Sequence, residues 1–140
     1  MLNQFLFVYG TLLESGNEFA LYLQNNSTVY AKGKFKGRLY DIDKYPGAVD
    51  DPDYEYDVYG SICLLKNPSA ALKHIDQYEG FGIGQPQPYL FIRKLIKAVT
   101  DQGLITCWVY IYNLPITGLH QISSGDYLTY KEDKKNPSDF

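Results

Sequence analysis

The feature that most restricts the possible folds is a long alternating stretch at residues 28–42. Small and apolar residues occupy every second position, and charged residues or tyrosine lie between them. One face of the predicted strand therefore meets a core, and the other meets water. The inward set is Val29, Ala31, Gly33, Phe35, Gly37 and Leu39. Glycine inside a strand is typical of a bend or bulge, so this strand favours the wall of a closed or nearly closed barrel.

The other regular segments predict a small α+β domain with a mostly antiparallel sheet. Residues 4–9 form a short apolar run typical of a strand buried on both faces, and residues 58–65 predict another strand. Residues 89–99 and 104–112 are separated by a short turn and predict an antiparallel hairpin. A short helix is predicted at residues 18–23.

Other parts of the chain are less regular. Residues 45–49 predict a turn of the Pro-Gly type, and residues 118–130 are weakly helical at best. Residues 131–140 are polar and predict a loose tail. No internal repeat or linker divides the chain, so we expect a single domain at residues 1–130 followed by the tail.

A second helix, at residues 67–80, has recognisable ends. Asn67 is a favourable N-cap, and Pro68 suits the first helical position. Gly80 supplies a stop, because glycine readily adopts the left-handed conformation that ends helices. The sequence therefore fixes both ends of this helix more closely than those of any other predicted element.

Glu79, in the last turn of this helix, is the candidate catalytic residue. Leu72, Ile75 and Glu79 are spaced three and then four residues apart, which places them on one helix face. If Leu72 and Ile75 face the core, Glu79 faces the interior too. An apolar environment raises the pKa of a carboxyl group towards neutrality, as a general acid/base requires. The alternative is a solvated Glu79 in a frayed helix end.

Composition argues against several classes of protein. The net charge is −3, and no cluster of Lys and Arg is dense enough to indicate nucleic-acid binding. No apolar run approaches the roughly 20 residues of a membrane-spanning helix. The first residues lack the basic region of a signal peptide. We therefore expect a cytoplasmic protein with neither a nucleic-acid nor a membrane partner.

The cysteines and histidines do not predict a metal site. Cys63 and Cys107 lie inside strand-like runs, where a reduced thiol usually packs as a small apolar group. His74 and His120 are isolated from them and from each other. No pair has the spacing of metal ligands.

Tyrosine is unusually frequent, with 14 of 140 residues. Its ring and hydroxyl suit the wall of a cavity that holds a polar ligand, although tyrosine is also simply a favourable strand residue. If the protein is an enzyme, we expect several tyrosines to converge near Glu79. If it is a structural interaction protein, we expect many tyrosines to be exposed instead.

The first strand ends abruptly at Gly10-Thr11-Leu12. Glycine directly after a buried strand allows close approach of the backbone. The amide groups that follow are then available to bind a carboxylate or an oxyanion. The alternative is an ordinary connection between a strand and a helix.

Several short motifs together resemble the gamma-glutamylcyclotransferase-like family, in particular its small bacterial and plant-type members. The motifs are Tyr9-Gly10-Thr11-Leu12, Tyr45-Pro46-Gly47, Tyr78-Glu79-Gly80, Phe91-Ile92-Arg93, Trp108-Val109-Tyr110-Ile111-Tyr112 and Ser124-Gly125-Asp126-Tyr127. The resemblance covers roughly residues 5 to 130. It implies a small mixed, mostly antiparallel β-barrel flanked by short helices, with one pocket.

The resemblance also implies roles for individual residues. The family's catalytic glutamate falls on Glu79, and its glycine loop, which holds the glutamyl part of the substrate, falls on Gly10-Thr11-Leu12. The predicted substrate-binding set is Tyr9, Gly10, Thr11, Leu12, Tyr45, Pro46, Gly47, Arg93 and Tyr110. Phe91 departs from the pattern, because the family often has tyrosine there. Tyr89 on the same predicted face is a possible replacement for the missing hydroxyl.

The implied activity is cyclisation of a gamma-glutamyl amide to 5-oxoproline with release of an amine or amino acid. No metal or organic cofactor is implied, and the oligomeric state stays open. Arg93 either pairs with a substrate carboxylate or forms a structural ion pair. The alternative function is a non-catalytic module that binds gamma-glutamyl compounds or regulates through them.

Overall fold

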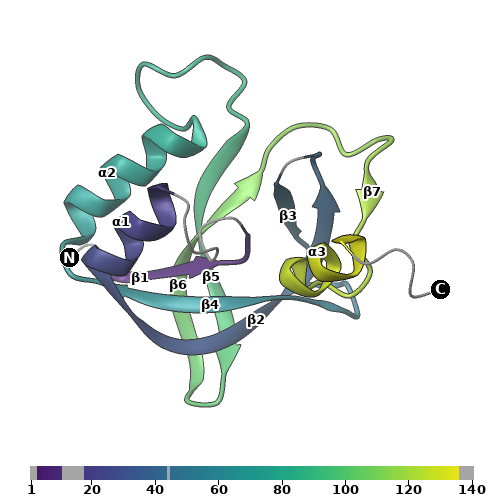
Figure 1. The fold of residues 1–140 in the computed structure, drawn as a ribbon, viewed down its shortest axis with the longest axis horizontal. Coiled ribbons are helices and arrows are strands. Elements are labelled where there is room, and N and C mark those ends of the chain that lie inside the picture. The colour runs from purple at the N-terminus through teal and green to yellow at the C-terminus, as the bar shows by residue number, and fades with distance from the viewer. Residues whose placement is uncertain (1–2, 11–17, 44, 136–140) are drawn as a thin grey trace.

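The fold is a barrel that closes where its longest strand pairs with the strand of a hairpin (Figure 1). The computed structural model describes residues 3–10, 18–43 and 45–135. The strands follow the order β2-β4-β1-β6-β5, and β2 also pairs with β5. They are β1 (Phe5–Val8), β2 (Ser27–Asp41), β4 (Asp57–Leu65), β5 (Phe91–Thr100) and β6 (Gly103–Tyr112). The predicted α+β barrel is confirmed.

The short strand β1 lies in the middle of this sheet. It pairs antiparallel with β4 and parallel with β6, and every other pairing is antiparallel. Its two faces support separate cores. Phe7 packs inside the barrel, whereas Leu6 and Val8 pack beneath the first two helices. The strand is buried on both faces, as its continuous apolar run predicted.

Helices α1 (Glu18–Asn26) and α2 (Pro68–Glu79) lie side by side over one side of the sheet (Figure 1). The rings of Tyr22 and His74 stack between them, with centroids 4.2 Å apart. The predicted ends of α2 are confirmed. Asn67 Oδ1 accepts a hydrogen bond from the Ala70 amide, and Gly80 takes the left-handed conformation with φ +72°.

The prediction of a turn at residues 45–49 was wrong. Strand β3 (Pro46–Asp50) pairs antiparallel with β2 as an edge strand. The turn comes just before it, where the Ile42 amide donates to the Tyr45 carbonyl. Pro46 is tolerated because it is the first residue of an edge strand, where a missing N–H group is not needed for a central ladder.

Two further expectations need correction. Val29 was predicted to face the core, but it is 73% exposed, because the β2–β4 register shifts between Val29 and Ala31. Helix α3 (Tyr127–Lys135) continues past residue 130, so residues 131–135 are helical rather than loose. The short strand β7 (His120–Gln121), which pairs with β2, was also not predicted. No helix among the described residues is long and apolar enough to cross a membrane.

Candidate active site

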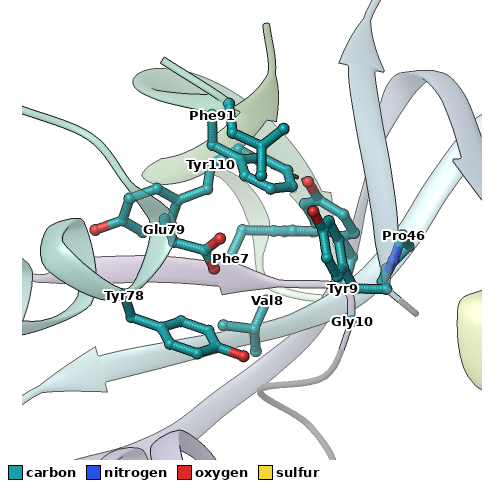
Figure 2. Close-up of a pocket in the computed structure, with 11 residues that line it drawn as sticks. Phe7, Val8, Tyr9, Gly10, Pro46, Tyr78, Glu79, Phe91 and Tyr110 are labelled. Carbon is teal, nitrogen blue, oxygen red and sulfur yellow. Dashed lines mark hydrogen bonds between the residues drawn. The ribbon is translucent and has the colours of Figure 1, made fainter. Parts of the chain in front are cut away.

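One cavity, of about 210 Å³, lies where β1, β6, the start of β3 and the end of α2 meet (Figure 2). Aromatic and aliphatic side chains form most of its wall. The residues that line it are Phe7, Val8, Tyr9, Gly10, Tyr45, Pro46, Tyr78, Glu79, Leu90, Phe91 and Tyr110. Glu79 is the only charged residue among these described residues, so the described part of the wall presents a single carboxylate in an apolar setting.

The Glu79 carboxylate points into this cavity (Figure 2). Leu72 and Ile75, on the same face of α2, are buried, as the spacing predicted. Within the part of the chain that the structure describes, the carboxylate accepts no hydrogen bond. Burial therefore acts without compensation and raises the pKa of Glu79 to about 7. At neutral pH the group exists in both protonation states and can accept or donate a proton.

The Tyr9 hydroxyl is not available to a ligand, although its ring lines the cavity. It donates to the Tyr110 carbonyl and accepts from the Ala48 amide. Burial raises the pKa of Tyr9, so the hydroxyl stays neutral. Tyr9 therefore joins β1, β3 and β6 beneath the cavity and acts as part of its floor.

The Tyr110 hydroxyl is also engaged, on the far side of the cavity wall. It donates to Asp76 Oδ1 at 2.6 Å. Arg93 makes two hydrogen bonds to the same carboxylate, Nε to Oδ1 at 2.9 Å and Nη2 to Oδ2 at 3.1 Å. Its guanidinium lies 4.3 Å from the Trp108 ring centroid. Burial and the hydrogen bond to Asp76 raise the pKa of Tyr110.

Arg93 does not line the cavity. Of the two predicted roles, the structural ion pair is the one that its contacts with Asp76 and Trp108 favour. Gly47 is likewise outside the lining. A side chain at that position would lie 2.9 Å from Tyr112 Cβ, so Gly47 allows β3 to approach β6 closely.

The structure brings several other predicted residues together. Tyr9, Gly10, Tyr45, Pro46 and Tyr110 all line the cavity with Glu79. Thr11 and Leu12 lie outside the described residues, so their part in binding stays a prediction. Tyrosines converge near Glu79, as an enzyme predicts, although others such as Tyr30, Tyr56 and Tyr59 are exposed.

The sequence analysis did not single out some of the lining residues. Tyr78, which packs against Phe19 at 3.4 Å between ring centroids, turns its ring to the cavity beside Glu79. Its place next to Glu79 in the motif was an available signal. Phe7, Val8 and Leu90 had no such signal, because apolar residues in or beside strands look alike whether they line a core or a cavity.

Phe91 is a wall residue and offers no hydroxyl. Tyr89 does not replace it. It lies just before β5, its ring packs edge-on against Phe81, and its hydroxyl accepts from Gln87 Nε2 at 3.2 Å. The hydroxyls of Tyr9 and Tyr110 are already engaged, so the side-chain hydroxyls that remain in the described wall are those of Tyr45 and Tyr78.

The described residues contain no group of three His, Cys, Asp or Glu side chains arranged to hold a metal ion. Cys63 and Cys107 are both buried, Cys107 in the barrel core and Cys63 beneath the helices. Neither lies in the cavity wall.

Comparison with known proteins identifies the family of the chain. Residues 6–129 match the family model described as gamma-glutamyl cyclotransferase, AIG2-like. The chain belongs to this family. A gamma-glutamylcyclotransferase family protein of Escherichia coli K12, YtfP, is 31% identical over 130 residues, which cover 88% of this chain and 95% of that protein.

Solved structures of similar proteins share the fold. The solution structure of ytfP from Escherichia coli matches with a TM-score of 0.64 at 29% identity, over 91% of this chain and 98% of that one. The crystal structure of YkqA from Bacillus subtilis matches with a TM-score of 0.72 at 24% identity. That match covers 96% of this chain but 43% of YkqA, so YkqA is the longer protein.

Proposed function

We propose that the chain is a gamma-glutamyl cyclotransferase in which Glu79 is the general acid/base. The observation that carries the proposal is the Glu79 carboxylate itself, which is directed into an apolar cavity, has no partner among the described residues and has its pKa raised to about 7. A site for binding alone gains nothing from burying an unpaired carboxylate, since burial of such a group costs free energy. Membership of the family supports the choice of reaction.

The proposed reaction is an intramolecular aminolysis. The α-amine nitrogen of the glutamyl group attacks the γ-carbonyl carbon, and Glu79 takes the proton that the nitrogen loses. The tetrahedral intermediate then collapses, the bond from carbon to the leaving nitrogen breaks, and Glu79 returns the proton to that nitrogen. The products are 5-oxoproline and a free amine or amino acid. Because the nucleophile is tethered to the carbonyl, orientation supplies much of the acceleration.

The cavity suits the folded conformation that this cyclisation requires. Its aromatic wall restricts the substrate and excludes water, which strengthens electrostatic interactions within it. Because the hydroxyls of Tyr9 and Tyr110 are engaged, the donors that remain for the oxyanion are the hydroxyls of Tyr45 and Tyr78 and the backbone amides. The segment that begins at Gly10 is the candidate for that role, and it equally suits the substrate carboxylate.

The test is release of 5-oxoproline from a panel of gamma-glutamyl amino acids and amines. Glu79→Gln keeps the shape of the side chain but removes proton transfer, so activity falls by about 10²–10⁴-fold. Glu55→Gln, an exposed glutamate in the loop before β4, is the matched control and keeps full activity. Turnover that Glu79→Gln leaves unchanged would contradict the proposal.

The alternative is a non-catalytic module that binds gamma-glutamyl compounds. The observation in its favour is that Phe91 stands in place of a tyrosine and that the hydroxyls of Tyr9 and Tyr110 are engaged within the protein. Calorimetry with the same panel separates the two functions. Binding without release of 5-oxoproline favours the module.

A further inference from the structure

Asp76 and Glu79 belong to one turn of α2, but their surroundings differ. Asp76 contacts a cross-strand pair, because Arg93 on β5 and Tyr110 on β6 lie directly opposite each other. Residues three apart on a helix project to the same side. The contacts of Asp76 therefore fasten the last turn of α2 to the barrel, and that turn ends with Glu79.

We propose that Asp76 is a positioning residue for Glu79. Its contacts direct the Glu79 carboxylate into the cavity, and they keep the guanidinium of Arg93 and the hydroxyl of Tyr110 from binding that carboxylate. This role of Asp76 deepens the proposed function and rests on it, because it takes Glu79 to be the general acid/base. It supplies a reason why one helical turn carries one paired carboxylate and one without a partner among the described residues.

Arg93 is a donor that is only partly satisfied. Its Nη1 is buried and has no hydrogen-bond partner among the described residues, although Nε and Nη2 are bound to Asp76. Without Asp76 the whole guanidinium would be buried and unpaired, at high cost in free energy. Glu79 is a carboxylate one turn further along the same helix. An ion pair between Arg93 and Glu79 would hold Glu79 ionised and end its use as an acid.

Tyr110 links the two carboxylates directly. Its ring forms the cavity wall beside Glu79 (Figure 2), and its hydroxyl donates to Asp76 Oδ1. The charges of Asp76, Arg93 and Glu79 all act on its pKa, the first and last raising it and Arg93 lowering it. Among the described residues, the titratable groups around Glu79 are Tyr9 just after β1, Tyr45 before β3, Tyr78 on α2 and Tyr110 on β6, with Asp76 and Arg93 behind the wall.

The test is the titration midpoint of the Glu79 carboxyl, followed by ¹³C NMR and assigned with Glu79→Gln. In Asp76→Asn the freed guanidinium lowers the midpoint by about 1–3 pH units, the usual effect of a nearby opposite charge. In Arg93→Met the uncompensated Asp76 raises it. The double variant, which removes both charges, returns it close to the value of the unmodified protein.

Asp51→Asn is the matched control, because it breaks the ion pair between Arg38 and Asp51, at 3.6 Å, away from the cavity. It leaves the midpoint unchanged. If Asp76→Asn does not fold, Arg93→Met and the double variant still measure the effect of Asp76. A common midpoint in every folded variant would overturn the proposal and leave Asp76 a purely structural role.

The titration separates this inference from the proposed function, because it needs no turnover. Shifted midpoints in a protein that releases no 5-oxoproline would refute the enzyme and keep the positioning role. In an active protein the same variants also move the acidic limb of the pH profile in the direction of the midpoint. A purely structural role would lower thermal stability without moving that limb.

Discussion

Asp76 and Glu79 lie three residues apart at the end of α2, and the first carboxylate is fully paired while the second has no partner among the described residues. The difference follows from what each one faces. Asp76 meets the polar ends of two strand residues, whereas Glu79 meets aromatic rings. One helical turn thus carries a paired carboxylate and a carboxylate whose pKa burial raises.

The raised pKa of Glu79 predicts how stability changes with pH. The folded-state pKa of about 7 lies above the ordinary value of 4.5, so the folded state holds the proton more tightly. The free energy of unfolding therefore falls as pH rises through the window from 4.5 to about 7. Glu79→Gln has no carboxyl group to titrate at this position. Between pH 4 and pH 8 its free energy of unfolding therefore rises by about 1–3 kcal/mol relative to that of the unmodified protein. Urea unfolding of both proteins at pH 4 and pH 8 measures this change. The same difference in free energy of unfolding between the two proteins at both pH values would contradict the prediction.

The same pKa predicts a limb in the pH dependence of turnover. If Glu79 acts first as a base, kcat/KM rises with pH through a midpoint near 7, because the free enzyme must be deprotonated. The residual activity of Glu79→Gln lacks this limb. A midpoint near 4.5 in the unmodified protein would show a solvated carboxylate.

Loss of the Tyr9 hydroxyl should destabilise the fold. Tyr9→Phe leaves the buried amide of Ala48 and the carbonyl of Tyr110 without a partner, at a cost of about 1–3 kcal/mol. Chemical denaturation measures the change. Tyr56→Phe, at a side chain that is 56% exposed, is the control and changes stability by less than about 0.5 kcal/mol.

Gly10 should tolerate no side chain. A Cβ atom there would lie 2.6 Å from Pro46 Cγ and 2.9 Å from Pro46 Cδ, and the proline ring has little freedom to move. Gly10→Ala therefore shifts the wall of the cavity and destabilises the protein by about 1–3 kcal/mol. Activity and denaturation are measured together. An active variant of unchanged stability would show that Pro46 yields easily.

The thiols should be unreactive in the folded protein. Both are buried, and burial raises the pKa of Cys107 to about 12. Because the thiolate is the nucleophile, neither residue reacts with Ellman's reagent at pH 8 until the protein is denatured. Rapid labelling of the native protein would indicate that the barrel opens often.

The sequence by itself determined most of the elements and the direction of Glu79. Asn67 and Gly80 mark the ends of α2 through local backbone chemistry, and the spacing of Leu72, Ile75 and Glu79 gives the buried helix face. Alternation along β2 gave the barrel wall. These features depend on residues close together in the chain, so a pattern is enough to find them.

Only the tertiary structure decided which groups around Glu79 are free. The hydroxyls of Tyr9 and Tyr110 are occupied by partners from other strands, and Arg93 is occupied by Asp76 from a helix. Pro46 begins an edge strand because β2 lies beside it. Each of these outcomes depends on a contact between distant parts of the chain. A side chain's type states what it can bind, and the fold alone selects the partner that it does bind.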